Sequence, residues 1–301
     1  MYIGQHTRQW LKGILTIQKS VIPAIFPRVL FCSAFGYLVS WLYVNGWSVS
    51  NPALGNLVPT LVLGLLLVFR TNTAYDRFWE GRKIWGSILC SSRNISQQIW
   101  VLVDEKEPVD RTQKQAALRL VIAFAVATKL YLRGEPLEEL APLVSPAQYN
   151  TLQTTSHPPL KVAFWIRDYL NTQYQRGRLD VYQLNEIVEL LNKLVDYLGA
   201  CERILKTPLP AAYSIHLKQL LLIYCLILPF DLVAELGWMT GFSTGLISFT
   251  LLGIEEIGLE IENPFGHDPN DLPLDAICQA IQGNIEELST FDSGAGQIES
   301  R

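Results

Sequence analysis

An apolar run that passes directly into a charged segment limits the folds open to this chain. Leu61 to Phe69 contains only aliphatic residues, glycine and phenylalanine, and Arg70 to Trp85 follows with four basic and two acidic side chains. No proline or turn sequence separates the two segments. The pattern therefore predicts one helix that leaves a membrane and continues into water.

Within this helix, Leu61, Leu65 and Phe69 recur every four residues and share one face. At a rise of about 1.5 Å per residue they form a stripe about 12 Å long. A stripe of bulky apolar side chains can line a dry constriction, or it can pack against another helix. Periodicity alone leaves both interpretations open.

Composition favours a membrane protein. Of 301 residues, 49% are hydrophobic and 17% are charged, whereas soluble domains average about 25% charged residues. The net charge is −4, and no basic cluster is interleaved with aromatic residues, so we expect no nucleic-acid partner.

The N-terminus lacks the pattern of a cleaved signal peptide. The cysteines lack CxxC spacing, which indicates reduced packing residues rather than disulfides or a zinc site; they are Cys32, Cys90, Cys201, Cys225 and Cys278.

Four apolar segments are predicted to span the membrane, and a charged helical region separates the second from the third. Between residues 93 and 210 charges recur, and the apolar stretch from Leu120 to Thr128 is too short to cross a bilayer core of about 30 Å. A helix is expected from Val181 to Leu205, before Pro208 and Pro210. The predicted spans are Val29–Val44, extendable back to Val21 past Pro23 and Pro27, a segment from Leu57, Ile215–Leu232 and Leu236–Leu252.

The distribution of basic residues predicts the orientation. They precede the first span and follow the second, whereas the two turns between spans contain none. The positive-inside rule then places both termini and the helical region in the cytoplasm. The expected organisation is an N-terminal region with the first two spans (1–92), a cytosolic helical region (93–210), the last two spans (211–254) and a cytosolic C-terminal segment (255–301).

Five motifs in fixed order resemble the bestrophin family over nearly the whole chain. They are Phe69-Arg70-Thr71-Asn72, Tyr75-x-Arg77-Phe78-x-Glu80-Gly81-Arg82-Lys83-x-Trp85, Ala200-Cys201-Glu202-Arg203-Ile204 with Thr207-Pro208-Leu209-Pro210, Leu228-Pro229-Phe230, and Asn263-Pro264-Phe265-Gly266. The resemblance is greatest to bacterial and plant-type members, among them anion channels of photosynthetic membranes. It implies an all-α membrane protein of four transmembrane helices and a cytosolic helical bundle, assembled as a homopentamer around a central pore. The membrane would be a bacterial-type plasma membrane or a photosynthetic membrane.

The same resemblance implies two constrictions. Leu61, Leu65 and Phe69 match the three hydrophobic rings of the family's neck, which would exclude water at rest and conduct on widening. Two of these positions are aliphatic, unlike the more aromatic necks of some relatives. The second, cytosolic aperture falls at Tyr182, with Val181 as its neighbour.

Polar residues after the neck are candidates for selectivity. Arg70 and Arg77 could create a vestibule of positive potential that concentrates anions, or they could form salt bridges between subunits. The amide of Asn72 could contact a passing ion, or it could cap a neighbouring helix.

A segment after the last span resembles the calcium clasp of calcium-gated relatives. Asn263, Asp268 and Asp271 match its side-chain ligands, and the backbone carbonyl of Glu260 would add to them; hard oxygen ligands suit Ca²⁺. His267, Pro269 and Asn270 interrupt the acidic run of the best-known binders. Alternatively, Asp271 caps the helix that begins near Leu272.

Taken together, the sequence predicts a passive channel for chloride and similar monovalent anions, and no enzyme. A monovalent cation channel of the same fold is the alternative, favoured by the acidic segment from Glu255 onward. A membrane enzyme would need the glutamates after 254 and His267 as a metal site, but no histidine has the helical spacing that such a site requires. A non-conducting scaffold is the third alternative.

Overall fold

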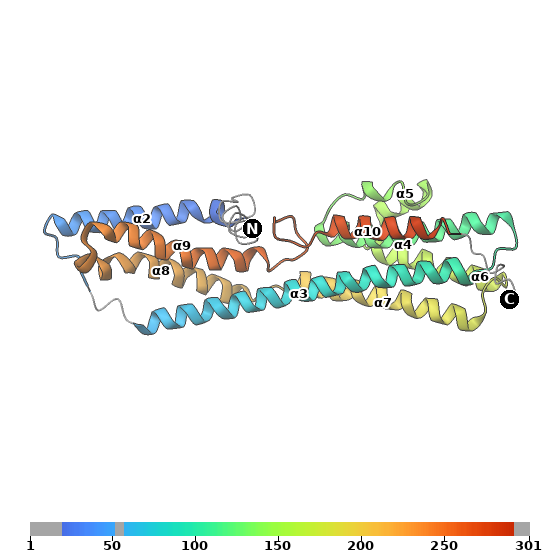
Figure 1. The fold of residues 1–301 in the computed structure, drawn as a ribbon, viewed down its shortest axis with the longest axis horizontal. Coiled ribbons are helices and arrows are strands. Elements are labelled where there is room, and N and C mark those ends of the chain that lie inside the picture. The colour runs from blue at the N-terminus through green and yellow to red at the C-terminus, as the bar shows by residue number, and fades with distance from the viewer. Residues whose placement is uncertain (1–19, 52–56, 292–301) are drawn as a thin grey trace, which may run out of the picture. The chain divides into compact units, whose positions relative to one another are not determined.

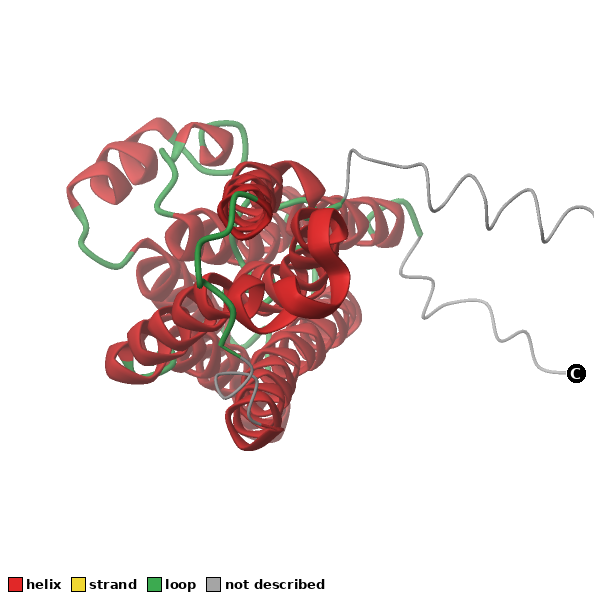
Figure 2. Ribbon diagram, turned by 90° about the vertical axis from the view of Figure 1, so that its left-hand side faces the viewer, coloured by secondary structure: helices red, strands yellow, loops and turns green. Residues whose placement is uncertain are grey.

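The computed structural model describes residues 20–51 and 57–291, and they form an all-helical fold without strands (Figure 1; Figure 2). The basic residues Arg8, Lys12 and Lys19 and part of the first predicted turn, 52–56, lie outside the described residues. The chain divides into two compact units, one of residues 1–78 and 208–271 and one of residues 79–207 and 272–301.

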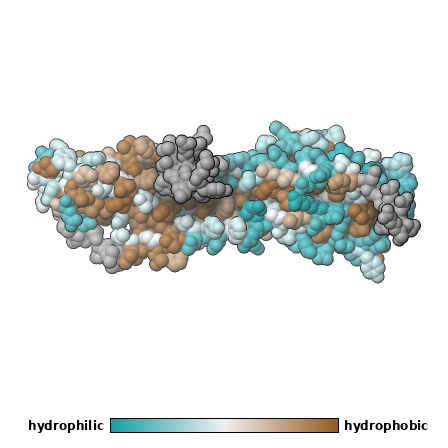
Figure 3. Space-filling model, in the orientation of Figure 1, coloured by the Kyte–Doolittle hydropathy of each residue, from teal (hydrophilic) through white to brown (hydrophobic). Residues whose placement is uncertain are grey.

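Each unit is a set of helices, and one long helix belongs to both. The first unit contains α2 (Ile22–Val44), the first part of α3 (Leu57–Leu102), α8 (Ala211–Leu236), the short η3 (Gly237–Met239) and α9 (Thr240–Glu260). The second contains the rest of α3, α4 (Pro108–Arg133), η2 (Glu138–Leu140), α5 (Pro146–Thr154), α6 (Pro158–Gln175), α7 (Val181–Lys206) and α10 (Leu274–Leu288). On the face drawn in Figure 3, hydrophobic side chains gather over α2, α8 and α9. The prediction of one continuous helix through Arg70 is confirmed.

In the first unit, α2 and α9 are in direct backbone contact. A Cβ added to Gly36 would lie 2.9 Å from the Cα of Gly241. The Ser33 hydroxyl donates to the Gly241 carbonyl at 3.0 Å, and the Ser40 hydroxyl donates to the Gly237 carbonyl at 3.0 Å. Small residues at such a crossing let apolar helices approach closely and exchange hydrogen bonds, as membrane helices do.

The second unit has its core around α4. From Leu120 to Leu130 every residue of this helix is buried, and α6, α7 and α10 pack against it. Even its buried lysines have partners, because the Lys129 ammonium lies 2.7 Å from a Glu139 carboxylate oxygen and 2.8 Å from one of Asp275. Gly134, at φ 67°, ends the helix in the left-handed conformation.

By length and hydropathy, three helical stretches among the described residues could cross a membrane: Ile22–Val44, Pro108–Arg133 and Ala211–Glu260. The last contains both the third and the fourth predicted spans. The Pro108–Arg133 stretch differs from the others because 78% of its apolar window is buried within the protein, against 22% and 28%. This difference identifies α4 as a core helix covered by protein, although its composition alone resembles that of a span.

The first part of α3 is not among these stretches. Its apolar run reaches Arg70 after nine residues, and polar residues follow. The second predicted span is therefore shorter in apolar length than its neighbours. Such a short apolar segment can lie in a membrane only where protein rather than lipid surrounds its polar continuation.

Candidate functional site

The first part of α3 presents two contrasting faces. Leu63 and Leu67 are 4% and 2% exposed and pack with leucines of α8. Leu61, Leu65 and Phe69 are 61%, 56% and 56% exposed. More than half of each stripe side chain is thus left uncovered by the described part of the chain, and lipid or another subunit would have to cover it in a packing role.

Beyond Phe69, the exposed face becomes polar. Asn72, Thr73 and Asp76 are exposed, and the Thr73 hydroxyl bonds back to the Phe69 carbonyl of the same helix at 2.9 Å. Among the described residues none forms a hydrogen bond with the Asn72 side chain, so the structure gives no support to a capping role. The Asn72 amide is thus exposed at the end of the apolar stripe.

Arg70 lies on the opposite, packed face. Its side chain is fully buried, and it donates to the Ser214 hydroxyl at 3.0 Å and to a Glu262 carboxylate oxygen at 3.3 Å. The other Glu262 oxygen accepts from the Leu209 amide at 3.1 Å. Nε of Arg77 donates to the Glu262 backbone carbonyl at 2.9 Å.

This network favours a structural role for both arginines. They fasten the segment after α9 to α3, and a buried guanidinium is tolerated because a carboxylate pairs with it. The sequence placed Glu262 in an acidic segment and did not indicate its pairing with Arg70. Glu262 lies 192 residues from Arg70, and no local pattern indicates such a pair.

The predicted aperture residues lie at the first turn of α7. The carboxylate of Asp180 caps the helix by accepting from the amides of Tyr182 at 2.7 Å and Gln183 at 2.9 Å. Tyr182 is 82% exposed and Val181 is 45% exposed. Both side chains are therefore available to a partner or an ion path, on a backbone that the cap holds in place.

The predicted calcium segment is a compact turn after α9. The Asp268 amide donates to the Asp271 carboxylate at 2.7 Å. A Cβ added to Gly266 would lie 2.8 Å from Oδ2 of Asp271 and 3.3 Å from Nδ2 of Asn263, so these two side chains flank the glycine. Oxygen donors of this type suit calcium, but Asp268 meets Asp271 through its backbone rather than its carboxylate. The candidate oxygen donors are therefore near one another in sequence and space, but they do not form a complete coordination shell for calcium.

Two alternatives for this region do not agree with the structure. The helix-capping interpretation of Asp271 is wrong, because α10 begins at Leu274 and its N-cap position is Pro273, without a side-chain cap. No group of three or more metal-ligating side chains forms within residues 20–51 and 57–291. The glutamates of the enzyme alternative have separate surroundings: Glu256 bonds Arg28, Glu260 bonds Asn270, Glu262 bonds Arg70, and Glu255 is buried.

Known proteins of similar sequence and fold are consistent with this geometry. The family model described as bacterial/fungal bestrophin protein matches residues 2–287. The chain is 60% identical to the voltage-dependent anion channel-forming protein alr2987 of Nostoc sp., over 94% of this chain and 93% of that protein. A similar protein of Synechocystis sp., sll1024, is 53% identical over 93% and 92% of the two chains. The crystal structure of a bacterial bestrophin homologue from Klebsiella pneumoniae superposes with a TM-score of 0.80 at 26% identity, over 88% of this chain and 98% of that chain.

Proposed function

Because this chain belongs to the bacterial/fungal bestrophin family, we propose that it forms a passive channel for chloride and similar monovalent anions. Relatives at 60% and 53% identity bear the name of anion channel-forming proteins. The observation that supports a pore in this chain is the exposed stripe of Leu61, Leu65 and Phe69 on a helix whose other face is packed. The proposal is a channel and not an enzyme.

In the proposed assembly, five copies surround one pore and α3 lines it. The spans are α2, the first part of α3, α8 and α9, with both termini in the cytoplasm. This arrangement accounts for the short apolar run of α3, because a helix at the centre of an oligomer is shielded from lipid by the others. A helix exposed to hydrocarbon would need about 20 apolar residues.

Gating follows from the chemistry of the stripe. Rings of leucine and phenylalanine offer no hydrogen bonds, so a narrow neck made of them expels water and blocks ions until it widens. Below the neck, the exposed Asn72 amide can donate to an anion. A second aperture at Tyr182 and Val181 would then filter ions in the water-exposed part of the path.

A cation channel is the alternative, and one observation favours it. Asp76 is exposed one helical turn beyond Asn72 on the same face. Five such carboxylates around a pore would attract cations. The two candidates differ in a single measurable quantity, the reversal potential.

The test is planar-bilayer recording of purified protein under a KCl gradient. Wild type is compared with the triple substitution Leu61→Ala, Leu65→Ala and Phe69→Ala. Val62→Ala is the matched control, because Val62 is exposed on α3 but off the stripe. We expect currents that reverse near the chloride potential and grow with the triple substitution only.

Other outcomes have definite meanings. Reversal near the potassium potential, abolished in Asp76→Asn, would establish the cation channel. Equal growth of current in Val62→Ala would remove the stripe from the gate. No current in any variant, with intact oligomers, would favour the scaffold.

A further inference from the structure

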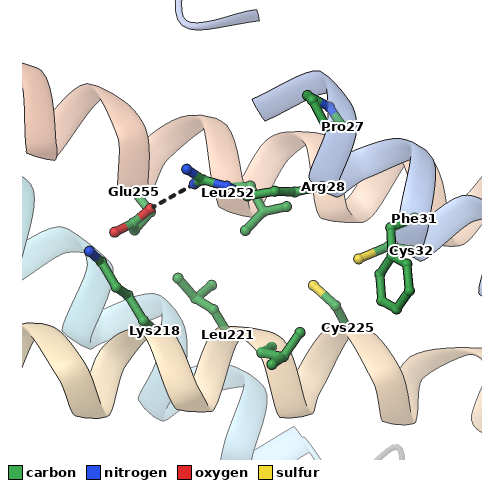
Figure 4. A pocket seen from close by; sticks show the side chains of 10 residues that line it. Pro27, Arg28, Phe31, Cys32, Lys218, Leu221, Cys225, Leu252 and Glu255 are labelled. Atoms are coloured by element: carbon green, nitrogen blue, oxygen red, sulfur yellow. Dashed lines mark ion pairs between the residues drawn. The ribbon is translucent and has the colours of Figure 1, made fainter. Parts of the chain in front are cut away.

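A cavity of about 450 Å³ lies within the first unit, among α2, α8 and α9 (Figure 4). Its volume is within the range of roughly 300–1,000 Å³ found for small-molecule pockets. The stripe and the Arg70 network do not contribute to its lining. The lining residues are Pro27, Arg28, Phe31 and Cys32 of α2, Lys218, Leu221, Leu222 and Cys225 of α8, and Leu252 and Glu255 of α9.

One end of the cavity is charged. Glu255 is 2% exposed, and its Oε1 has no hydrogen-bond partner among the described residues. Its Oε2 forms a long ion pair, at 3.9 Å, with the Arg28 guanidinium, which also bonds to a Glu256 carboxylate oxygen at 2.9 Å (Figure 4). Lys218 points toward Glu255 in Figure 4, yet no ion pair joins the two. A buried carboxylate with one unpartnered oxygen and an exposed ammonium thus face the same space.

The other end is apolar and open. The lining residues Cys32 and Cys225 are buried, whereas the lining residues Phe31 and Leu222 are 58% and 52% exposed and form the rim. Both rim residues belong to helices that we place in the membrane. The cavity therefore opens sideways toward hydrocarbon.

The polar end lies at one end of the helix bundle. Arg28 and Lys218 are near the beginnings of α2 and α8, and Glu255 is near the end of the antiparallel α9. From Lys218 to Cys225 the cavity extends about 10 Å along α8. In the proposed topology the charged end is at the cytoplasmic interface and the apolar end is deeper in the membrane, which is the layout of a lipid.

We propose that this cavity binds an anionic phospholipid whose headgroup carries hydroxyl donors, of which phosphatidylglycerol is the probe. Because Arg28 is already paired with Glu256, the Lys218 ammonium is the lining cation that can pair with the single negative charge of a phosphodiester. Basic pockets between membrane helices on the cytoplasmic side bind such headgroups. The glycerol hydroxyls would donate to the unpartnered oxygen of Glu255, and an acyl chain would lie along Phe31 and Leu222.

The test uses the full-length protein in detergent and phosphatidylglycerol with a photoreactive diazirine in its acyl chain. Cross-linked peptides are mapped by mass spectrometry. We expect labels within residues 27–32 and 218–225, displaced by unlabelled phosphatidylglycerol at lower concentration than by phosphatidylethanolamine or phosphatidylcholine. These competitors test which headgroup is recognised. Phosphatidylethanolamine has hydrogen-bond donors but no net charge, and phosphatidylcholine has neither donors nor net charge.

Lys218→Gln removes the free ammonium and keeps most of the side chain. Loss of a bond to a charged group should weaken labelling at limiting probe about tenfold. His216→Gln is the matched control, since His216 is exposed on the same helix outside the lining, and it should label as wild type does.

The proposal would be overturned by labels spread over other helices, by equal competition by phosphatidylcholine, or by unchanged labelling of Lys218→Gln. Equal competition by phosphatidylethanolamine would reject the anionic class. Since the readout is a cross-link and not a current, the failure of this site leaves the conduction experiment unaffected.

Discussion

The contact between α2 and α9 gives a sharp test of the fold, through the substitution Gly36→Ala. The new Cβ would meet the Gly241 Cα at 2.9 Å and the side chain of Thr244 at 3.1 and 3.2 Å. The nearest atom belongs to the backbone of a helix, so it cannot swing away as a side chain could. The methyl group can be accommodated only if the two helices separate.

The magnitude follows from two opposed effects. Alanine favours a helix over glycine by about 1 kcal/mol. Overpacking of a close contact costs typically about 1–3 kcal/mol, and separating the helices also stretches the bond that Ser33 donates to Gly241 of α9 and the bond that Ser40 donates to Gly237 of η3. The two contributions together give a net loss of about 0–2 kcal/mol, and the stretched hydrogen bonds move the expected loss to the upper half of that range.

The assay is the apparent Tm in detergent, and Gly253→Ala is the matched control on α9. Its Cβ would meet only a methyl group of Ile25, at 3.6 Å, which is an ordinary contact. The control should be as stable as wild type or more stable, while Gly36→Ala should unfold at least about 2 °C lower. If Gly36→Ala is as stable as Gly253→Ala, the backbone contact between α2 and α9 does not exist as described.

Three further predictions concern the second unit and the segment after α9. Hydrogen bonds from Lys129 and Arg133 of α4 lower the pKa of Asp275 to about 2. The ionised carboxylate therefore stabilises the fold above about pH 4, and this stabilisation is lost as the pH falls toward 2. Asp275→Asn should flatten the dependence of Tm on pH in that window, and the stability at stake is about 1 kcal/mol because the carboxylate is 55% exposed. Burial raises the pKa of Cys201 to about 12, so maleimide at pH 8 should modify the exposed Cys90 and leave Cys201 intact, and equal rates would contradict its burial. A calcium site in residues 260–271 predicts that a chelator lowers the current and that calcium restores it; a current indifferent to chelation would exclude a gating ion there.

Most of the helical framework could be predicted from the sequence, because local rules specify it. Val181 was expected to begin a helix and does so, with Asp180 as its cap. The prolines between residues 207 and 210 end that helix. Pro27 is tolerated within α2, which begins at Ile22 as the extended first span predicted.

Long-range pairing could not be predicted in this way. Arg70 was a candidate for the vestibule because basic residues after an apolar run normally remain near water. The structure instead pairs it with Glu262, which sequence reasoning saw only as part of an acidic segment. Likewise, Glu255 and Lys218 share a cavity through helix packing, and no motif indicates it.

In the proposed channel, one face of α3 serves folding and the other serves conduction. Leu67 and Arg70 hold the helix to α8 and to the segment after α9, while Leu65 and Phe69, on the other face, are each 56% exposed. Truncating the exposed side chains should therefore change the pore and leave the fold of the subunit intact. Glu262→Gln should do the reverse, since it leaves a buried guanidinium without its counter-charge, at a cost of about 3–5 kcal/mol. If one face of α3 serves folding and the other serves conduction, Glu262→Gln should give a low yield of folded protein and the stripe variants should give normal yields.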